Sequence, residues 1–263
     1  MRVALYVISM AIALASSVVA AADGPDCSRT FTLALHEHGL LCSSQTGAGI
    51  DKDFSDELMR RSGCKLSVSV LPRARIWQLI ESGALDFSLS GISNAERERY
   101  AGFAWYFSNK YYLLLRDGLK LKTLTEFKKN PDLKLGAIRS FWYSNNANLL
   151  IDQLRPENRV VYATGFDPLF KIFQSGQIQA MIIEPFDYPQ IENTALREQS
   201  VIIDTEDAAV PHGLIMSKKS LSALEQEKWR ALVQSMRRDG SVAKIFRKYM
   251  KPELADAITT FKD

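Results

Sequence analysis

The sequence predicts an α/β protein of two lobes, each a mostly parallel sheet flanked by helices, joined by a two-strand hinge. Strand and helix patterns alternate along the chain, which is typical of parallel sheets with crossover helices. One helix–turn–strand unit also occurs twice, at residues 77–86 and 170–179, each with a Ser-Gly turn. Such turns are common in many folds. The matching order of elements around both copies is what favours two lobes of like topology.

Length and composition allow one large or two medium globular domains. The chain has 263 residues, of which 46% are hydrophobic and 24% charged, as in ordinary globular proteins. The formal net charge is only +3, and no long run of Lys or Arg is present. Nucleic acid is therefore not an expected partner.

Residues 1–22 are predicted to be a signal peptide. Arg2 precedes an uncharged stretch, and small residues around Ala20 fit a signal-peptidase site. The alternative is a membrane anchor, but the strongly apolar part is short and is followed by Ser and Ala. We therefore expect an exported, periplasmic protein from which this segment is removed.

The elements of the first lobe follow from hydrophobic periodicity. Residues 65–71 alternate as a strand, whereas residues 51–62 place apolar side chains on one helical face. Gly83 ends a second helix in the manner of a C-terminal cap. The predicted strands are 31–36, 65–71 and 85–90, with helices at 51–62 and 75–82.

The second lobe repeats this order and is inserted into the first. Its predicted strands are 133–138, 159–162 and 178–183, with helices at 145–154 and 167–174. The chain then returns through a strand at 213–217 and helices at 221–238 and 241–249. Residues 111–116 and 210–217 would form the hinge. Lobe 1 is thus expected at 23–115 and 211–263, and lobe 2 at 116–210.

Several stretches together resemble a known family. These are GIDKDFSDELMRRSGC at 49–64, the segment 71–107, HGLIMSKKS at 212–220 and RRDGSVAKIFRKYM at 237–250. In order and spacing they are similar to the extracellular solute-binding proteins, family 3, of polar amino-acid ABC importers. The resemblance implies a periplasmic binding protein fold and a monomer. It would capture an amino acid or similar small zwitterion or carboxylate for a membrane permease, without a cofactor.

The loop after the strand at 85–90 is the first predicted part of the ligand site. Open α/β sheets bind ligands beyond the carboxyl ends of their strands. Ser90, Gly91 and Ser93 offer hydroxyl and backbone donors, and Arg97 offers a planar fork suited to a carboxylate. The resemblance implies that Ser90, Ser93 and Arg97 hold the ligand's α-carboxylate. The alternative for Arg97 is a surface salt bridge to a neighbouring glutamate.

Glu184 follows the strand at 178–183, where the family usually has an Asp that pairs with the ligand's α-ammonium. A solvated acid at a strand end is an equal alternative. A different class of function also stays open here. Some relatives of this fold are dehydratases of cyclic carboxylates, in which Glu184 could serve as a general acid. The sequence contains no Gly-x-Ser-x-Gly, His-Glu-x-x-His or P-loop motif, and we expect no catalytic residue.

Arg139 and Ser140 follow the strand at 133–138, where the resemblance implies a hydroxyl and backbone amides on the carboxylate. Phe141 and Trp142 come next. They could stack on a flat or apolar ligand, or one of them could fill the core of the second lobe.

Arg73 stands where the family often has an apolar residue, and it would suit a second acidic group on the ligand. Arg73 or Arg75 could equally pair with a structural carboxylate. His36 and His38 form a His-x-His pair, which is weak evidence for metal without further ligands. We expect one of these histidines to border the cleft, and no metal site.

Three cysteines are present, Cys27, Cys42 and Cys64. Export favours one disulfide and one remaining thiol. Cys27 precedes the first strand and Cys64 the second, and neighbouring parallel strands begin at the same sheet edge. Cys42 follows the first strand, at the opposite edge. We therefore predict a Cys27–Cys64 disulfide with Cys42 free.

Overall fold

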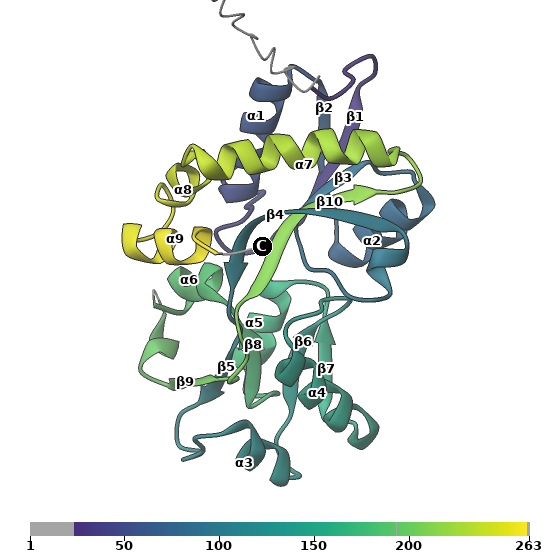
Figure 1. Cartoon of the computed structure of the whole chain (residues 1–263). Helices are drawn as coiled ribbons and strands as arrows, with labels where there is room; N and C mark the ends of the chain where they lie inside the picture. The colour runs from purple at the N-terminus through teal and green to yellow at the C-terminus, as the bar shows by residue number, and fades with distance from the viewer. Residues whose placement is uncertain (1–23, 193, 262–263) are drawn as a thin grey trace, which may run out of the picture.

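The protein contains two five-stranded sheets. The computed structural model describes residues 24–192 and 194–261, so the predicted signal peptide lies outside the described residues. The strand orders are β2-β1-β3-β10-β4 and β7-β6-β8-β5-β9. We call the part built on the first sheet lobe 1 and the part built on the second sheet lobe 2. In Figure 1, lobe 1 lies above lobe 2.

Lobe 1 has helices on both sides of its sheet, and α7 lies across it in Figure 1. Its strands are β1 (Phe31–Leu35), β2 (Leu66–Val70), β3 (Phe87–Gly91), β4 (Ala101–Asn109) and β10 (Val210–Ser217). Its helices are α1 (Ile50–Ser62), α2 (Arg73–Ser82), α7 (Ala223–Arg238), α8 (Ser241–Phe246) and α9 (Pro252–Thr259).

Lobe 2 repeats the arrangement on a smaller scale. Its strands are β5 (Tyr112–Arg116), β6 (Leu135–Ile138), β7 (Val160–Ala163), β8 (Ala180–Ile183) and β9 (Ser200–Asp204). Its helices are α3 (Leu124–Lys129), α4 (Asn145–Leu154), α5 (Phe166–Gln174) and α6 (Tyr188–Glu192).

The two sheets have the same topology, which confirms the α/β fold predicted from the repeat. In each sheet one strand runs against its neighbours: β10 is antiparallel to β3 and β4, and β5 is antiparallel to β8 and β9. The sheets are therefore mixed, although the other strands run in one direction. The repeated turns also match, because Gly83 and Gly176 both adopt φ 79°, the left-handed region that favours glycine.

The chain passes between the lobes twice. It leaves the first sheet after Asn109 and enters the second at Tyr112, and it returns between Asp204 and Val210. The two crossing segments are joined side by side. Thr205 Oγ1 donates to the carbonyl oxygen of Tyr111 at 2.8 Å, and Lys110 Nζ lies 2.9 Å from Asp204 Oδ2.

Several elements were not predicted, and β4 is the most informative of them. Within its aromatic run at residues 103–107, Tyr106 and Phe107 are fully buried. Both faces of β4 are covered over most of its length, so no polar residues alternate with the apolar ones. The other unpredicted elements are β9, α3, α6 and α9.

The predicted disulfide is confirmed. Cys27 and Cys64 are bonded, with their Cα atoms 4.8 Å apart, and Cys42 is a buried free thiol. The bridge joins the starts of β1 and β2, whose parallel register pairs Phe31 with Leu66.

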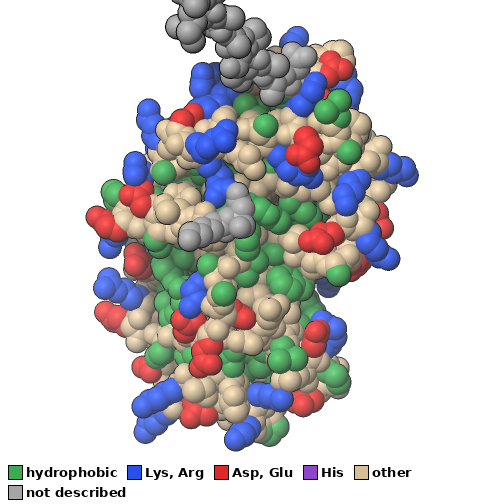
Figure 2. Space-filling model, in the orientation of Figure 1, with side chains coloured by type: hydrophobic (Ala, Val, Ile, Leu, Met, Phe, Trp, Pro, Cys, Tyr) green, Lys and Arg blue, Asp and Glu red, His purple; other side chains and the backbone are tan. Residues whose placement is uncertain are grey.

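The outer surface is mixed in charge. On the face drawn in Figure 2, Lys and Arg are interspersed with Asp and Glu, and hydrophobic side chains gather near the junction of the lobes. Within the described ranges, no helix has the length and apolarity needed to cross a membrane.

Candidate functional site

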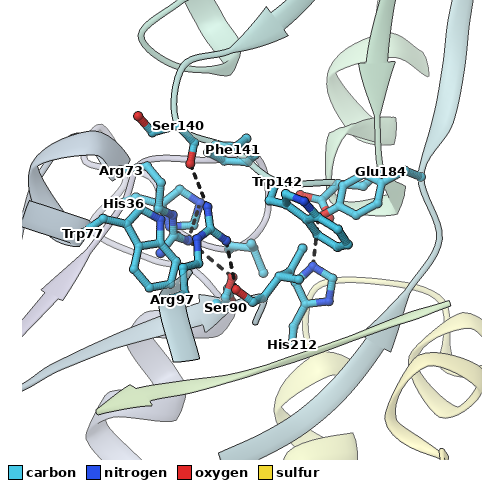
Figure 3. Close-up of a pocket in the computed structure, with 14 residues that line it drawn as sticks. His36, Arg73, Trp77, Ser90, Arg97, Ser140, Phe141, Trp142, Glu184 and His212 are labelled. Carbon is cyan, nitrogen blue, oxygen red and sulfur yellow. Dashed lines mark hydrogen bonds between the residues drawn. The ribbon is translucent and has the colours of Figure 1, made fainter. Parts of the chain in front are cut away.

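A narrow cavity of about 20 Å³ lies between the lobes, beyond the carboxyl ends of several strands. Lobe 1 contributes the end of β1, the start of α2 and the end of β3. Lobe 2 contributes the segments after β6 and β8, and the crossing segments complete the wall. In Figure 3, Arg73, Arg97, His36 and Trp77 gather at one side, Glu184 and His212 lie at the other, and Trp142 lies between them. The lining residues are His36, Leu41, Arg73, Trp77, Ser90, Gly91, Ile92, Arg97, Tyr111, Ser140, Phe141, Trp142, Glu184 and His212.

Arg97 joins the two lobes. Its guanidinium donates to the carbonyl oxygen of Ile92 in lobe 1 and to that of Ser140 in lobe 2, each at 2.9 Å. It lies over the ring of Trp77, 4.0 Å from the centroid. Burial lowers the pKa of Arg97 to about 10, which leaves it charged at neutral pH. A buried fork at the mouth between two lobes is well placed to bind a carboxylate.

Arg73 is the second buried guanidinium. It begins α2 and donates to the carbonyl oxygens of Leu89 and Ser90, at 3.1 and 3.4 Å. Its Nη2 lies 2.6 Å from Nδ1 of His36. Burial lowers the pKa of Arg73 to about 10, and burial together with Arg73 holds the pKa of His36 well below its usual range. His36 is thus a neutral acceptor, and Arg73 carries the charge. Arg75, the other arginine considered, is exposed.

Ser90 lines the cavity, but its hydroxyl points into lobe 1. Ser90 Oγ donates to Asp51 Oδ1 at 2.7 Å, and Tyr106 Oη donates to the same oxygen at 3.0 Å. Ser90 has φ 54°, an uncommon conformation for a residue with a side chain. Burial raises the pKa of Asp51 to about 6, although the two hydroxyl donors oppose the shift.

Glu184 faces the cavity with both of its carboxylate oxygens engaged. Oε1 lies 2.7 Å from Nε2 of His38, and Oε2 accepts a hydrogen bond from the side-chain amide of Asn109. His38 also lies 3.2 Å from Asp187 Oδ1. Burial alone would lower the pKa of His38, but the two carboxylates outweigh it and raise that pKa to about 9. His38 is therefore a buried cation that links lobe 1 to lobe 2.

His38, Glu184 and Asp187 are also the described residues that could hold a metal ion, since their ligand atoms lie within 4.8 Å of one another. Nε2 of His38 lies within ion-pair distance of both carboxylates, at 2.7 and 3.2 Å, but the angles give no hydrogen bond there. Nδ1 of His38 and Oδ1 of Asp187 also have no hydrogen-bond partner among the described residues. A protonated His38 compensates one of the two carboxylate charges. The arrangement thus acts as a salt bridge between the lobes.

Other predicted site residues differ in their placement. Ser140 contributes its carbonyl oxygen to Arg97 and Trp142 is half-buried in the lining, whereas Arg139 is exposed and lies outside this cavity. Ser93 does not line it either. Gly91 does, and a side chain there would collide with Ile215, which packs against it.

Five lining residues had no sequence-based prediction of ligand contact, namely Leu41, Ile92, Trp77, Tyr111 and His212. Trp77 appeared only as part of the repeat, and Tyr111 and His212 as parts of the hinge. Tyr111 Oη and His212 Nε2 lie 2.9 Å apart, so the two crossing segments meet at the wall of the cavity. Burial lowers the pKa of His212 to about 4, which keeps the ring neutral. For Tyr111 and His212, the available sign of a place at the cavity was their position near the starts of the predicted crossing strands.

Comparison with solved structures shows that the protein has the two-lobed periplasmic binding protein fold. An ancestral arginine-binding protein bound to arginine matches with a TM-score of 0.71 and 19% identity, over 84% of this chain and 98% of that chain. The GluR0 ligand-binding core from Nostoc punctiforme, in complex with L-glutamate, gives a TM-score of 0.69 and 13% identity, over 84% and 100%. At these identities the matches establish the fold.

A third structure belongs to an ancestral amino-acid-binding protein described as a precursor of cyclohexadienyl dehydratase. Its TM-score is 0.70 and its identity 19%, over 84% of this chain and 95% of that chain. The chain belongs to the bacterial extracellular solute-binding proteins, family 3, whose family model matches residues 40–252. A search of curated proteins finds no match.

Proposed function

We propose that this protein captures a small solute bearing a carboxylate, such as an amino acid or a similar acid, in the cleft between its lobes. The observation that carries the proposal is the placement of Arg97. Its guanidinium is buried at the lobe junction, touches backbone from both lobes and meets no carboxylate among the described residues. A bound carboxylate would supply the missing counter-charge and draw the lobes together.

The matched structures support this class of ligand. The ancestral protein is bound to arginine and the GluR0 core to L-glutamate, and both ligands carry a carboxylate. We further propose that the protein acts in the periplasm as a monomer and delivers its solute to the membrane permease of an ABC importer. The predicted signal peptide and the family membership support that role.

Catalysis is the alternative function, favoured by the match to a dehydratase precursor. A general acid needs a proton to donate, and Glu184 already forms an ion pair with His38 through Oε1 and accepts a hydrogen bond from Asn109 with Oε2. We therefore propose binding without turnover. Incubation of the wild-type protein with prephenate should give no product, and turnover would overturn this part of the proposal.

Native mass spectrometry tests the binding role directly. Protein purified from the periplasm without refolding should retain a small molecule, seen as a mass above that of the chain. After dialysis, a panel of amino acids and small carboxylates should contain solutes that raise the melting temperature, because ligand bound to the folded state stabilises it. Failure of the whole panel to do so would contradict the proposed function.

A further inference from the structure

We propose that the cleft selects an anion that carries no amino group, because its buried arginines lack carboxylate partners while its one lining carboxylate is already paired. This inference rests on the proposed function and narrows its ligand. Figure 3 shows the two sides of the cavity, with Arg73 and Arg97 opposite Glu184.

The arginine side has positive charge to spare. Across the described ranges, the Arg73 guanidinium contacts His36, three residues of β3 (Ser88, Leu89 and Ser90) and the ring of Phe141. Those of Arg97 are two carbonyl oxygens and the face of Trp77. Backbone dipoles and a neutral imidazole solvate these charges but do not neutralise them. Two buried cations at one cavity wall therefore favour an anionic ligand.

On the glutamate side, a cationic histidine already lies against the carboxylate. A ligand ammonium that reached Glu184 would lie beside His38, whose Nε2 is 2.7 Å from Oε1, and beside the Asn109 amide that donates to Oε2. His38 is only 3% exposed, and its ring packs against those of Phe141 and Phe166, with centroids 5.4 and 5.7 Å away. Displacing it would uncover a buried cation, which is costly. The chain's own His38 thus occupies the position an ammonium would take.

Two other acids lie near the cavity, and each is held by side chains of the protein. Asp51 is fully buried behind Ser90, with Oδ1 bonded to two hydroxyls. Asp187 is 1% exposed, contacts His38, and accepts from the backbone N–H of Glu184 at 3.0 Å. Neither lines the cavity.

The middle of the cavity indicates the body of the ligand. Trp77, Tyr111, Phe141 and Trp142 all line it. Aromatic walls favour a flat or apolar body. The best match is a small carboxylate with an aromatic or apolar body and no amine.

Isothermal titration with matched pairs tests the inference. The probes are 3-phenylpropionate against L-phenylalanine, glutarate against L-glutamate, and 4-methylpentanoate against L-leucine, each pair differing by one amino group. For every pair that binds the dialysed wild type, we expect the acid without the amine to bind at least about tenfold tighter. In the variant His38→Gln, Glu184 loses its ion-pair partner. The ratio of the two affinities should then shift in favour of the amino acid by at least about tenfold.

His212→Gln is the matched control. It removes another buried lining histidine, one that bonds to Tyr111 and Val210 and forms no hydrogen bond or ion pair with Glu184. Both affinities can therefore change while their ratio stays within about threefold. Equal or tighter binding of the amino acids by the wild type would overturn the inference and leave the proposed function standing. If neither member of any pair binds, the proposed function itself is contradicted. Titrations repeated with EDTA should agree; a changed affinity would assign a metal to the His38 cluster and overturn the inference.

Discussion

The two sides of the cleft hold buried charge in opposite ways. Arg73 and Arg97 rest on carbonyl oxygens and an aromatic face, whereas Glu184 sits between a cationic histidine and an amide. An arginine that is solvated only by partial dipoles can still bind a carboxylate. A glutamate that already forms an ion pair binds a further cation less strongly. Charge type in a lining therefore does not by itself predict ligand charge; the existing partners decide which groups are available.

Arg97→Ala is the most direct way to break the arginine side. We expect it to remove ligand-induced stabilisation, with a loss of about 2–5 kcal/mol of binding free energy, because a buried charge partner is deleted. The measurement is the melting temperature with and without the best solute of the panel. The circular dichroism spectrum of the variant should match that of the wild type. An undiminished thermal shift would remove Arg97 from the site.

His38 should make stability depend on pH. Burial and Arg73 would lower its folded-state pKa, but Asp187 and Glu184 outweigh them and raise it from 6.5 to about 9, so its protonated form stabilises the folded protein. That contribution is complete below pH 6.5 and is lost as the pH rises through 9. Urea unfolding of the wild type and His38→Gln should show a stability difference that shrinks by up to about 1.4 kcal/mol per pH unit in this window.

His212→Gln serves as the control for that experiment. Because its pKa is lowered to about 4, His212 stays neutral over the same range. The stability difference between this variant and the wild type should be flat with pH. A flat difference for His38→Gln as well would show that His38 carries no charge in the folded protein.

The variant Arg73→Met distinguishes the role of Arg73 from that of Arg97. If Arg73 receives a second acidic group, the variant should lose about tenfold more affinity for glutarate than for butyrate. Arg75→Met, an exposed arginine two residues along α2, is the control and should leave both affinities unchanged. Equal losses for the two probes would mean that Arg73 acts on the site's general charge and does not contact a second carboxylate.

Ser90→Ala should have the smallest effect on the ligand. The hydroxyl belongs to the Asp51 network, so we expect about 1 kcal/mol lower unfolding free energy. Ligand affinity should change by less than about threefold, since the backbone that lines the cavity is retained. A loss of affinity without a loss of stability would restore the sequence-based assignment of Ser90 to the ligand.

The sequence predicted features that depend on local pattern and chain order. The repeated turns predicted two lobes, and the order of strands predicted the Cys27–Cys64 disulfide. The loop after β3 predicted Arg97 as a ligand-binding residue, and Arg97 lines the cavity. The inward turn of Ser90 depends on its φ of 54°, which no pattern of residue types encodes. The pairing of His38 with Glu184 was also missed, because it arises only when two distant strand ends meet across the cleft.

The paired crossing segments have a mechanical consequence. The Thr205–Tyr111 hydrogen bond and the Lys110–Asp204 ion pair join the two crossing segments into one paired connection. Two paired segments bend most easily about the line that joins them. They resist shear and twisting along their length. Opening and closing of the cleft would then be a hinge rotation about a single axis. Arg97 would return to Ser140, and His38 to Glu184, in the same alignment after each cycle.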